Sequence, residues 1–333
     1  MNINLFYLSG NTTGGWVTYT AHLMYGLKQA GYNPLLYKVG NRSEMKRRQF
    51  GYDQEYRNIC LGDAEHIVRT GGLMVPDNPN CNSVIVALQK NFREKAQALL
   101  EHGAWMVVHD PAEFANLKLS DSNRYITIRK AVQKQIPDSH LVLHPYHRHF
   151  KPKTKATGEL NACSISRIDF DKHTDILLDA NRLLPKDKQI QINGFENRLY
   201  TRFKICPNYP EWEQSKAAYP REREVATSIC HKATYAVDMS VIKGDGGGTQ
   251  YSFMEAMDAG SINIINRKWL IPGDEMKVGV NCFAVSDGEE LAAILKKSLK
   301  GQDVMVKNSD ILLARHDAKL IAKQFVEVLN AKA

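Results

Sequence analysis

The alternation of two hydrophobic patterns along the chain is the feature that most limits its fold. Short apolar runs, typical of buried strands, are separated by stretches in which apolar residues recur every three or four positions, as they do in helices. The runs lie at residues 3–9, 35–39, 83–87, 105–109, 125–128, 140–144, 162–166, 189–193, 234–240 and 261–265. Strands separated by helices pair in parallel, so this order predicts an α/β protein built from βαβ units.

The helices expected between these runs are marked by apolar spacing and by glycines near several of their ends. They are predicted at residues 16–27, 91–102, 130–135, 176–184, 251–259, 289–299 and 309–330. In parallel α/β sheets, ligands bind beyond the carboxyl ends of the strands. Functional residues are therefore expected in the loops that follow strands.

A change in composition divides the chain into two halves. Segment 144–160 is basic, contains prolines and has almost no aliphatic residues, which is typical of a linker between domains. We place the boundary near residue 155 and predict two Rossmann-like domains, 1–155 and 156–333, that face a central cleft. We leave open that the terminal helix packs back on the first domain.

The overall composition excludes several classes of protein. With 43% apolar and 24% charged residues, the chain is neither intrinsically disordered nor a membrane protein, and it has no run of eighteen apolar residues. Residues 1–9 have the pattern of a first strand and not of a secretion signal, so we expect a cytoplasmic protein. Lys and Arg exceed Asp and Glu by 44 to 36, and the resulting net charge of +8 favours an anionic partner.

A glycine-rich loop follows the run at 234–240 and precedes the helix that contains Glu255. Its residues are Gly244, Asp245, Gly246, Gly247, Gly248, Thr249 and Gln250. Glycines remove every Cβ at a helix N-terminus, where backbone N–H groups can approach a phosphate or a sugar closely. The alternative is a flexible turn, and the spacing is that of neither a P-loop nor a dinucleotide fingerprint.

A basic loop follows the run at 162–166. Arg167 and Lys172 are cations suited to neutralising a diphosphate, and the alternative is an ordinary solvated loop. Between them, Asp169 and Asp171 form a D-x-D pattern that is also found at Mg²⁺ or Mn²⁺ sites. Because two carboxylates at this spacing often occur by chance, we predict that the protein has no metal site.

His109 ends the apolar run at 105–109, at the expected edge of the first sheet. A histidine there can contact a ligand, and the alternative is a core histidine bonded to the backbone. Asp110 and Glu113 follow it closely and could orient an acceptor hydroxyl or lie at a helix N-terminus.

Two clusters of basic residues suggest a polyanionic partner, although such clusters are also common on solvated faces. The first cluster follows the second strand, and the second lies at the domain boundary. From them we select Arg42, Lys46, Arg47, Arg48, Arg148 and Lys151 as candidate contacts to nucleic acid.

Taken together, the segments 166–180 and 245–265, the Gly14-Gly15 turn and His109 resemble the retaining GT-B glycosyltransferases, which use nucleotide sugars. Within that group the chain is most similar to bacteriophage enzymes that modify viral DNA, such as hydroxymethylcytosine glucosyl and arabinosyl transferases. The resemblance extends over nearly the whole chain in element order.

The resemblance implies roles for individual residues. Arg167 and Lys172 would hold the donor diphosphate, Glu255 the donor ribose, and His109 the transferred sugar. The donor site as a whole would consist of Gly14, Gly15, Asp245, Gly246, Gly247, Gly248, Thr249, Gln250 and Glu255. The family usually has a second acid eight residues before Glu255, and this chain has Gly247 there, so Asp245 or the glycine amides would take its role.

We therefore expect an enzyme that transfers a sugar, with retention, from a UDP-linked donor to a hydroxyl on a modified base of double-stranded phage DNA. No metal cofactor and no membrane span are expected, and the compartment would be the host cytoplasm. A saccharide or lipid-linked glycan acceptor is the first alternative. The second is a non-catalytic module of the same fold that binds nucleic acid.

Overall fold

The computed structural model describes residues 1–9, 14–38, 82–110, 113, 117, 124–152, 158–217, 223–241, 246–297 and 301–331. The chain forms two compact units, Met1–His147 with Arg315–Ala333, and Arg148–Ala314. The basic segment at 144–160 thus overlaps the division, and the end of the chain from Arg315 belongs to the first unit. No described helix combines the length and the apolar character that crossing a membrane requires.

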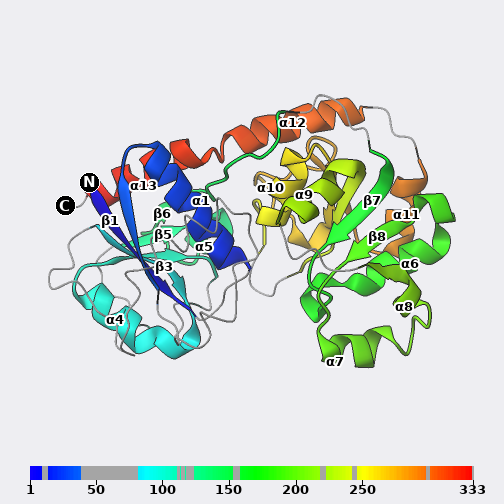
Figure 1. Cartoon of the computed structure of the whole chain (residues 1–333), viewed down its shortest axis with the longest axis horizontal. Coiled ribbons are helices and arrows are strands. Elements are labelled where there is room, and N and C mark those ends of the chain that lie inside the picture. The colour runs from blue at the N-terminus through cyan, green and yellow to red at the C-terminus, as the bar shows by residue number, and fades with distance from the viewer. Residues whose placement is uncertain are drawn as a thin grey trace. The chain divides into compact units, whose positions relative to one another are not determined.

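The first unit contains a parallel sheet, several strands of which are labelled in Figure 1. The order of its strands is β2-β1-β3-β4-β5-β6. Its strands are β1 (Asn2–Leu8), β2 (Asn33–Lys38), β3 (Ser83–Leu88), β4 (Trp105–Val108), β5 (Tyr125–Thr127) and β6 (His140–Leu141). Its helices are α1 (Gly15–Gln29), α4 (Arg93–Glu101), α5 (Lys130–Gln133) and α13 (Ala318–Asn330). Apart from Asn2 at the start of β1, the inner strands β1, β3 and β4 are buried, as expected for a sheet that helices cover.

The second unit contains a parallel sheet in the order β12-β11-β10-β7-β8-β9. Its strands are β7 (Leu160–Ile165), β8 (Ile190–Asn193), β9 (Lys216–Ala217), β10 (Ala233–Asp238), β11 (Ile262–Asn266) and β12 (Cys282–Val285). Its helices are α6 (Thr174–Leu183), α7 (Arg198–Tyr200), α8 (Trp212–Ser215), α9 (Arg223–Lys232), α10 (Tyr251–Asp258), α11 (Gly288–Lys296) and α12 (Gln302–Ala314), with a π-helical turn at Thr201–Ile205.

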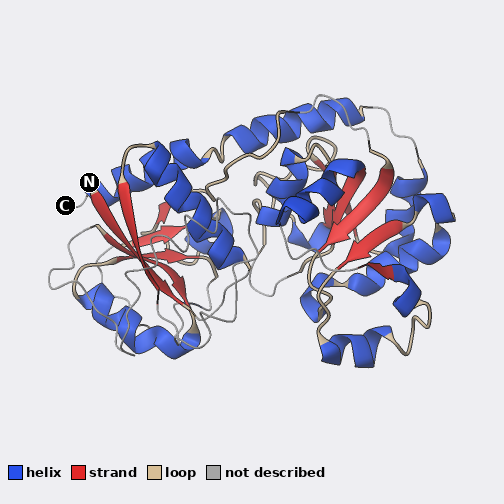
Figure 2. Cartoon of the chain, in the orientation of Figure 1, coloured by secondary structure: helices blue, strands red, loops and turns tan. Residues whose placement is uncertain are grey.

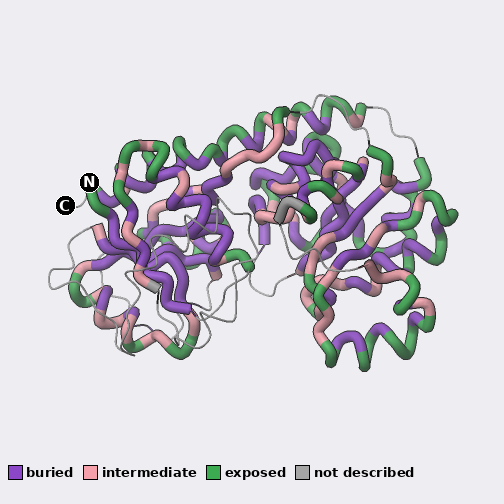
Figure 3. The backbone as a smooth tube through the Cα atoms, in the orientation of Figure 1, coloured by how far each residue is buried: buried purple, intermediate pink, exposed green. Residues whose placement is uncertain are grey.

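Helices cover both faces of the second sheet (Figure 2), and its central strands are largely buried (Figure 3). Successive residues of a strand point to opposite faces. Tyr235 and Val237 accordingly pack into the core shared with α6 and α11, whereas Ala236 packs with residues of α9 and α10. Because β10 is packed against other elements on both faces, we expect a ligand to bind near its carboxyl end.

The terminal helical region departs from its predicted form. The single helix expected at 309–330 is two helices, because residues 315–317 leave the helix and Asp317 pairs with Tyr146. The N–H of Tyr146 donates to the carbonyl of His316 at 2.6 Å, and Asp317 then caps α13 through the N–H of Leu320.

Helix α13 packs against α1 in the first unit. The contact depends on Gly26, because a Cβ added there would lie 2.1 Å from the carbonyl oxygen of Ala318. Any side chain at Gly26 would therefore push the two helices apart.

Candidate functional site

The second sheet changes direction of winding between β7 and β10. The chain proceeds from β7 through β8 to β9 on one side, and from β10 through β11 to β12 on the other. In open α/β sheets, ligands bind at such a switch point, outside the carboxyl ends of the two central strands. The loops that begin at Ser166 and Met239 leave these two strand ends, so both motifs singled out in the sequence meet at the switch point.

Arg167 lies on the first of these loops, and its side chain is 59% exposed. It donates to the carboxylate of Asp169 at 2.8 Å and to that of Asp171 at 2.9 Å. The other oxygen of Asp169 accepts from the backbone N–H of Phe170 and from Asn197. The two acids of the D-x-D pattern thus hold Arg167 in this structure.

Within the described part of the chain, no group of three or more His, Cys, Asp or Glu side chains could hold a metal ion.

Lys172 extends from the same loop to the neighbouring strand end, where its ammonium donates to the hydroxyl of Ser240. His173 follows in a left-handed conformation with φ 44°, and α6 begins directly after it. A left-handed turn at a non-glycine residue is uncommon and costs about 1–2 kcal/mol. This turn ends the short 3-10 helix that carries Lys172 and lets α6 start in a new direction.

The described part of the glycine-rich loop, Gly246 to Gln250, leads into α10, while Asp245 lies outside the described residues. Gly247 and Gly248 have φ of 69° and 65°, a region that favours glycine. The N–H of Gly247 donates to the carbonyl of Trp269 at 2.7 Å, and the indole of Trp269 donates to the carbonyl of Gly248. The Gly247 amide is therefore engaged within the protein.

Asp274 lies against this loop and was not singled out by the sequence. One of its carboxylate oxygens accepts from the N–H of Glu275, and the other is buried without a hydrogen-bond partner in the described structure. That second oxygen lies 2.3 Å from the position that a Cβ on Gly247 would occupy. The neighbouring Thr249 is fully buried, and its hydroxyl donates to Glu275.

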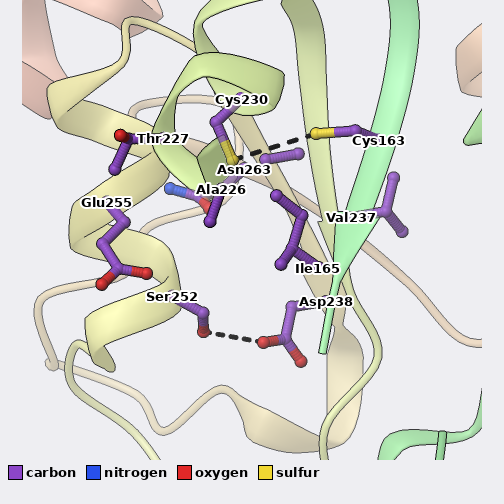
Figure 4. A pocket seen from close by; sticks show the side chains of 11 residues that line it. Cys163, Ile165, Ala226, Thr227, Cys230, Val237, Asp238, Ser252, Glu255 and Asn263 are labelled. Carbon is purple, nitrogen blue, oxygen red and sulfur yellow. Dashed lines mark hydrogen bonds between the residues drawn. The ribbon is translucent and has the colours of Figure 1, made fainter. Parts of the chain in front are cut away.

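A pocket opens between β7, β10 and the helices α9 and α10 (Figure 4). Glu255 and Ser252 of α10 line it together with Asp238 at the end of β10. Glu255 thus shares a pocket with the strand end from which the loop leading to the glycines departs. Gln250 occupies the cap position of α10 with extended backbone and makes no side-chain capping hydrogen bond.

In the first unit, Gly14 and Gly15 begin α1 beyond the carboxyl end of β1. The carbonyl of Gly14 accepts from the N–H groups of Val17 and Thr18, and among the described residues a Cβ on either glycine would meet no atom within 4 Å.

His109 follows β4 and is buried. Its Nε2 lies 2.9 Å from the carbonyl oxygen of Val86, which can only accept, so Nε2 carries the proton and the ring packs edge-on against Tyr19. Burial and, to a lesser extent, the positive charge of Arg129 lower the pKa of His109 to about 4, although the hydrogen bond to Val86 acts in the opposite direction. The residue has the contacts of a core histidine and is neutral at pH 7.

Glu113 lies beside His109 and is also buried. Burial raises the pKa of Glu113 to about 8, although its carboxylate accepts from the N–H of His109 and from the indole of Trp16. The side chain of Glu113 therefore connects the loop after β4 with the first turn of α1.

The buried His109 makes the stability of the protein depend on pH. Its pKa is lower in the folded chain than in the unfolded chain, so its contribution is present above about pH 6.5 and is lost as the pH falls toward 4. We expect the free energy of unfolding to fall by about 2 kcal/mol between pH 7 and pH 5 through this residue. His109→Gln should remove that part, measured by urea unfolding at both pH values, and an unchanged pH dependence would contradict it.

Of the six candidate contacts to nucleic acid, the structure describes only Arg148 and Lys151. Arg42, Lys46, Arg47 and Arg48 lie outside the described residues. Lys151 is exposed. Arg148 is half-buried and ion-paired with Asp258 and Asp310, so a phosphate contact by Arg148 would compete with two carboxylates.

No family model matches the sequence, and no curated protein matches it in a sequence search. Solved structures do match. Anabaena Alr3699/HepE in complex with UDP-glucose aligns over 99% of this chain and 100% of its own, at 14% identity and a TM-score of 0.68. The pneumococcal O-GlcNAc transferase GtfA, in complex with UDP and GlcNAc, aligns over 100% and 99% at 10% identity and a TM-score of 0.64.

A third structure is an alpha-glucosyltransferase in complex with UDP-glucose and DNA containing an abasic site. It aligns over 99% of each chain, at 12% identity and a TM-score of 0.66. With two parallel six-stranded sheets covered by helices, the chain has the GT-B glycosyltransferase fold, as the sequence predicted.

Proposed function

We propose that this protein is a glycosyltransferase that takes its sugar from a UDP-linked donor. The observation that carries the proposal is the meeting of Arg167, Lys172 and the glycine-rich loop at the switch point of the second sheet. Two cations at one strand edge suit a diphosphate. The solved structures of similar fold that hold UDP or UDP-glucose support the same donor.

In the proposed reaction, the bond between the sugar's anomeric carbon and the diphosphate breaks while the acceptor hydroxyl bonds to the same face of that carbon. The acceptor's proton passes to the departing phosphate oxygen, so the products are the glycoside and UDP. Arg167 and Lys172 stabilise the charge that develops on the diphosphate. Glu255 accepts hydrogen bonds from the ribose. Nε2 of neutral His109 already donates to Val86, so the ring contacts the transferred sugar through Nδ1, which accepts from a hydroxyl.

Asp274 is our candidate for the carboxylate that the family pattern lacks at Gly247. Its unpartnered oxygen lies where a side chain at position 247 would begin. An unpaired carboxylate oxygen in a buried place costs about 1–3 kcal/mol, which a sugar hydroxyl would offset by donating to it. The glycine-rich loop would then bind the sugar of the donor, and Arg167 and Lys172 would bind its diphosphate.

We propose that the reaction needs no metal ion, because Arg167 and Lys172 can supply the positive charge that Mg²⁺ or Mn²⁺ would otherwise provide. Activity is expected to survive excess EDTA, measured as UDP release from the donor. Complete loss that added Mn²⁺ or Mg²⁺ restores would reassign Asp169 and Asp171 to a metal.

For the acceptor we propose a hydroxyl on a modified base, such as hydroxymethylcytosine, in phage DNA. The net charge of +8 and the DNA in one of the matching structures support this choice. Incubation with labelled UDP-sugars and modified or unmodified DNA tests it, with label in modified DNA as the expected result. Label in a saccharide instead would favour the glycan acceptor, and a chain that neither transfers nor hydrolyses the donor would be a binding module.

Duplex binding should depend steeply on salt if Lys46, Arg47 and Arg48 contact phosphates. Neutralising all three is expected to weaken binding about equally across sequences and to lower the log–log salt slope by roughly one unit per cation. Hydrolysis of the donor serves as the control and should be unaffected. DNA affinity equal to that of the wild type would make these residues an ordinary solvated face.

A further inference from the structure

Asp238 is a buried carboxylate at the carboxyl end of β10, where the apolar run of that strand stops. One of its oxygens accepts from both the backbone N–H and the hydroxyl of Ser240. The other accepts from the hydroxyl of Ser252 at 2.7 Å, as the dashed line in Figure 4 marks. Both oxygens of this acid are thus occupied by donors from the protein.

The hydroxyl of Ser240 connects Asp238 to Lys172. A hydroxyl has one proton and two lone pairs, and the proton of Ser240 is directed to Asp238. Its lone pairs therefore face the Lys172 ammonium, which donates to it. An ammonium has three N–H groups, so two remain to bind an anion while the third fixes its position.

The hydroxyl of Ser252 connects the same carboxylate to α10. Ser252 lies in the first turn of this helix, directly after the glycine-rich loop. Asp238 therefore holds two elements that come from opposite sides of the switch point, the lysine loop after β7 and the start of α10.

The electrostatics agree with this arrangement. Burial would raise the pKa of Asp238, but the charge of Lys172 and the hydrogen bonds from Ser240 and Ser252 outweigh burial and lower the pKa below its usual value. The acid is ionised at pH 7 and remains an acceptor for both hydroxyls.

We propose that Asp238 is a positioning residue of the donor site, which through Ser240 and Ser252 sets the Lys172 ammonium and the first turn of α10 at fixed places around the donor diphosphate. The proposal rests on the proposed function. Asp238 itself touches no substrate in this scheme, because the protein already occupies both of its oxygens.

Positioning and simple charge make opposite predictions for this residue. A negative charge near a diphosphate repels it, so by charge alone both Asp238→Ala and Asp238→Asn would tighten UDP binding. If Asp238 is a positioning residue, Asp238→Ala weakens UDP binding, because the Lys172 side chain is then no longer held in place and must be ordered when UDP binds. Asp238→Asn keeps an acceptor for Ser240 and a polar partner for Ser252, and should restore most of the affinity.

The test is calorimetric titration of the full chain with UDP, with the melting temperature measured for each variant. We expect Asp238→Ala to weaken UDP binding about 5- to 10-fold and Asp238→Asn to stay within about 3-fold of the wild type. In a Lys172→Ala background, Asp238→Ala should have a smaller further effect, because only the connection to α10 through Ser252 then remains. Ser240→Ala removes the connection to Lys172 while the buried acid stays in place, and should weaken binding in the same way.

Asp258→Ala is the matched control. Asp258 is a buried carboxylate at the other end of α10 and is paired with Arg148. Its loss should lower the melting temperature and leave UDP affinity unchanged.

Two results would overturn the positioning role and leave the proposed function standing. One is tighter UDP binding in both Asp238 variants, and the other is that Asp238→Ala weakens UDP binding by the same factor in the wild-type and Lys172→Ala backgrounds. If Asp238→Ala fails to fold, unchanged UDP affinity in Ser240→Ala overturns it just as well. A wild-type chain that does not bind UDP at all would overturn the proposed function, and this inference with it.

Discussion

Turnover is expected to fall by about 100-fold or more when either Arg167 or Lys172 is replaced by alanine. Arg167→Ala removes a cation and leaves Asp169 and Asp171 without their counter-charge at the same strand edge. Two uncompensated carboxylates there would repel the diphosphate in addition to the loss of the guanidinium. Lys172→Ala removes the ammonium that Ser240 holds, so the developing charge on the leaving group loses its second partner.

The measurement is kcat for UDP release, with and without acceptor. Arg182→Ala is the matched control, because Arg182 is also an exposed guanidinium in the second unit and makes two hydrogen bonds to Glu211. It lies on α6 away from the carboxyl ends of β7 and β10, and its loss should leave kcat near that of the wild type. Wild-type turnover in both Arg167→Ala and Lys172→Ala would remove the assignment of the diphosphate site.

Most of the fold could be predicted because helix and strand spacing is a local property of the sequence. The parallel pairing of both sheets followed from the order of elements and is confirmed. The interruption between α12 and α13 could not be predicted in this way, since residues 315–317 contain neither proline nor glycine. It arises from pairing with Tyr146, which is far away in the sequence. The short strand β12 and the polar helix α9 also gave too weak a pattern to be predicted.

In the candidate site, too, the features that depend on contacts between distant residues could not be predicted from the sequence. Arg167, Lys172 and the glycines could be singled out because each follows a strand in a recognisable local pattern. Asp238 and Asp274 could not, because their importance lies in contacts with residues distant in the sequence. The only sequence signal for Asp238 was an acid at the end of an apolar run, which is also a common way for a strand to end.

Gly247→Val is expected to abolish detectable UDP binding and to lower the melting temperature. A branched side chain at this position would do more than block the amides of the loop. In the structure, the Gly247 amide already bonds to Trp269, and a Cβ would lie 2.3 Å from the buried oxygen of Asp274. Either the loop or the buried Asp274 side chain must therefore move, and the left-handed φ of 69° adds a backbone cost of about 1–2 kcal/mol.

Two further variants separate the clash from the backbone cost. Gly279 has φ 76° and open space around its Cβ position, so Gly279→Val has a similar backbone cost without the collision and should bind UDP like the wild type. Adding Asp274→Ala to Gly247→Val removes the obstructing oxygen, and the melting temperature should recover in part. If Gly247→Val and Gly279→Val lower the melting temperature equally and both bind UDP like the wild type, the close approach of Asp274 to the glycine-rich loop affects neither stability nor UDP binding. Loss of UDP in Gly247→Val alone would place the donor at this loop.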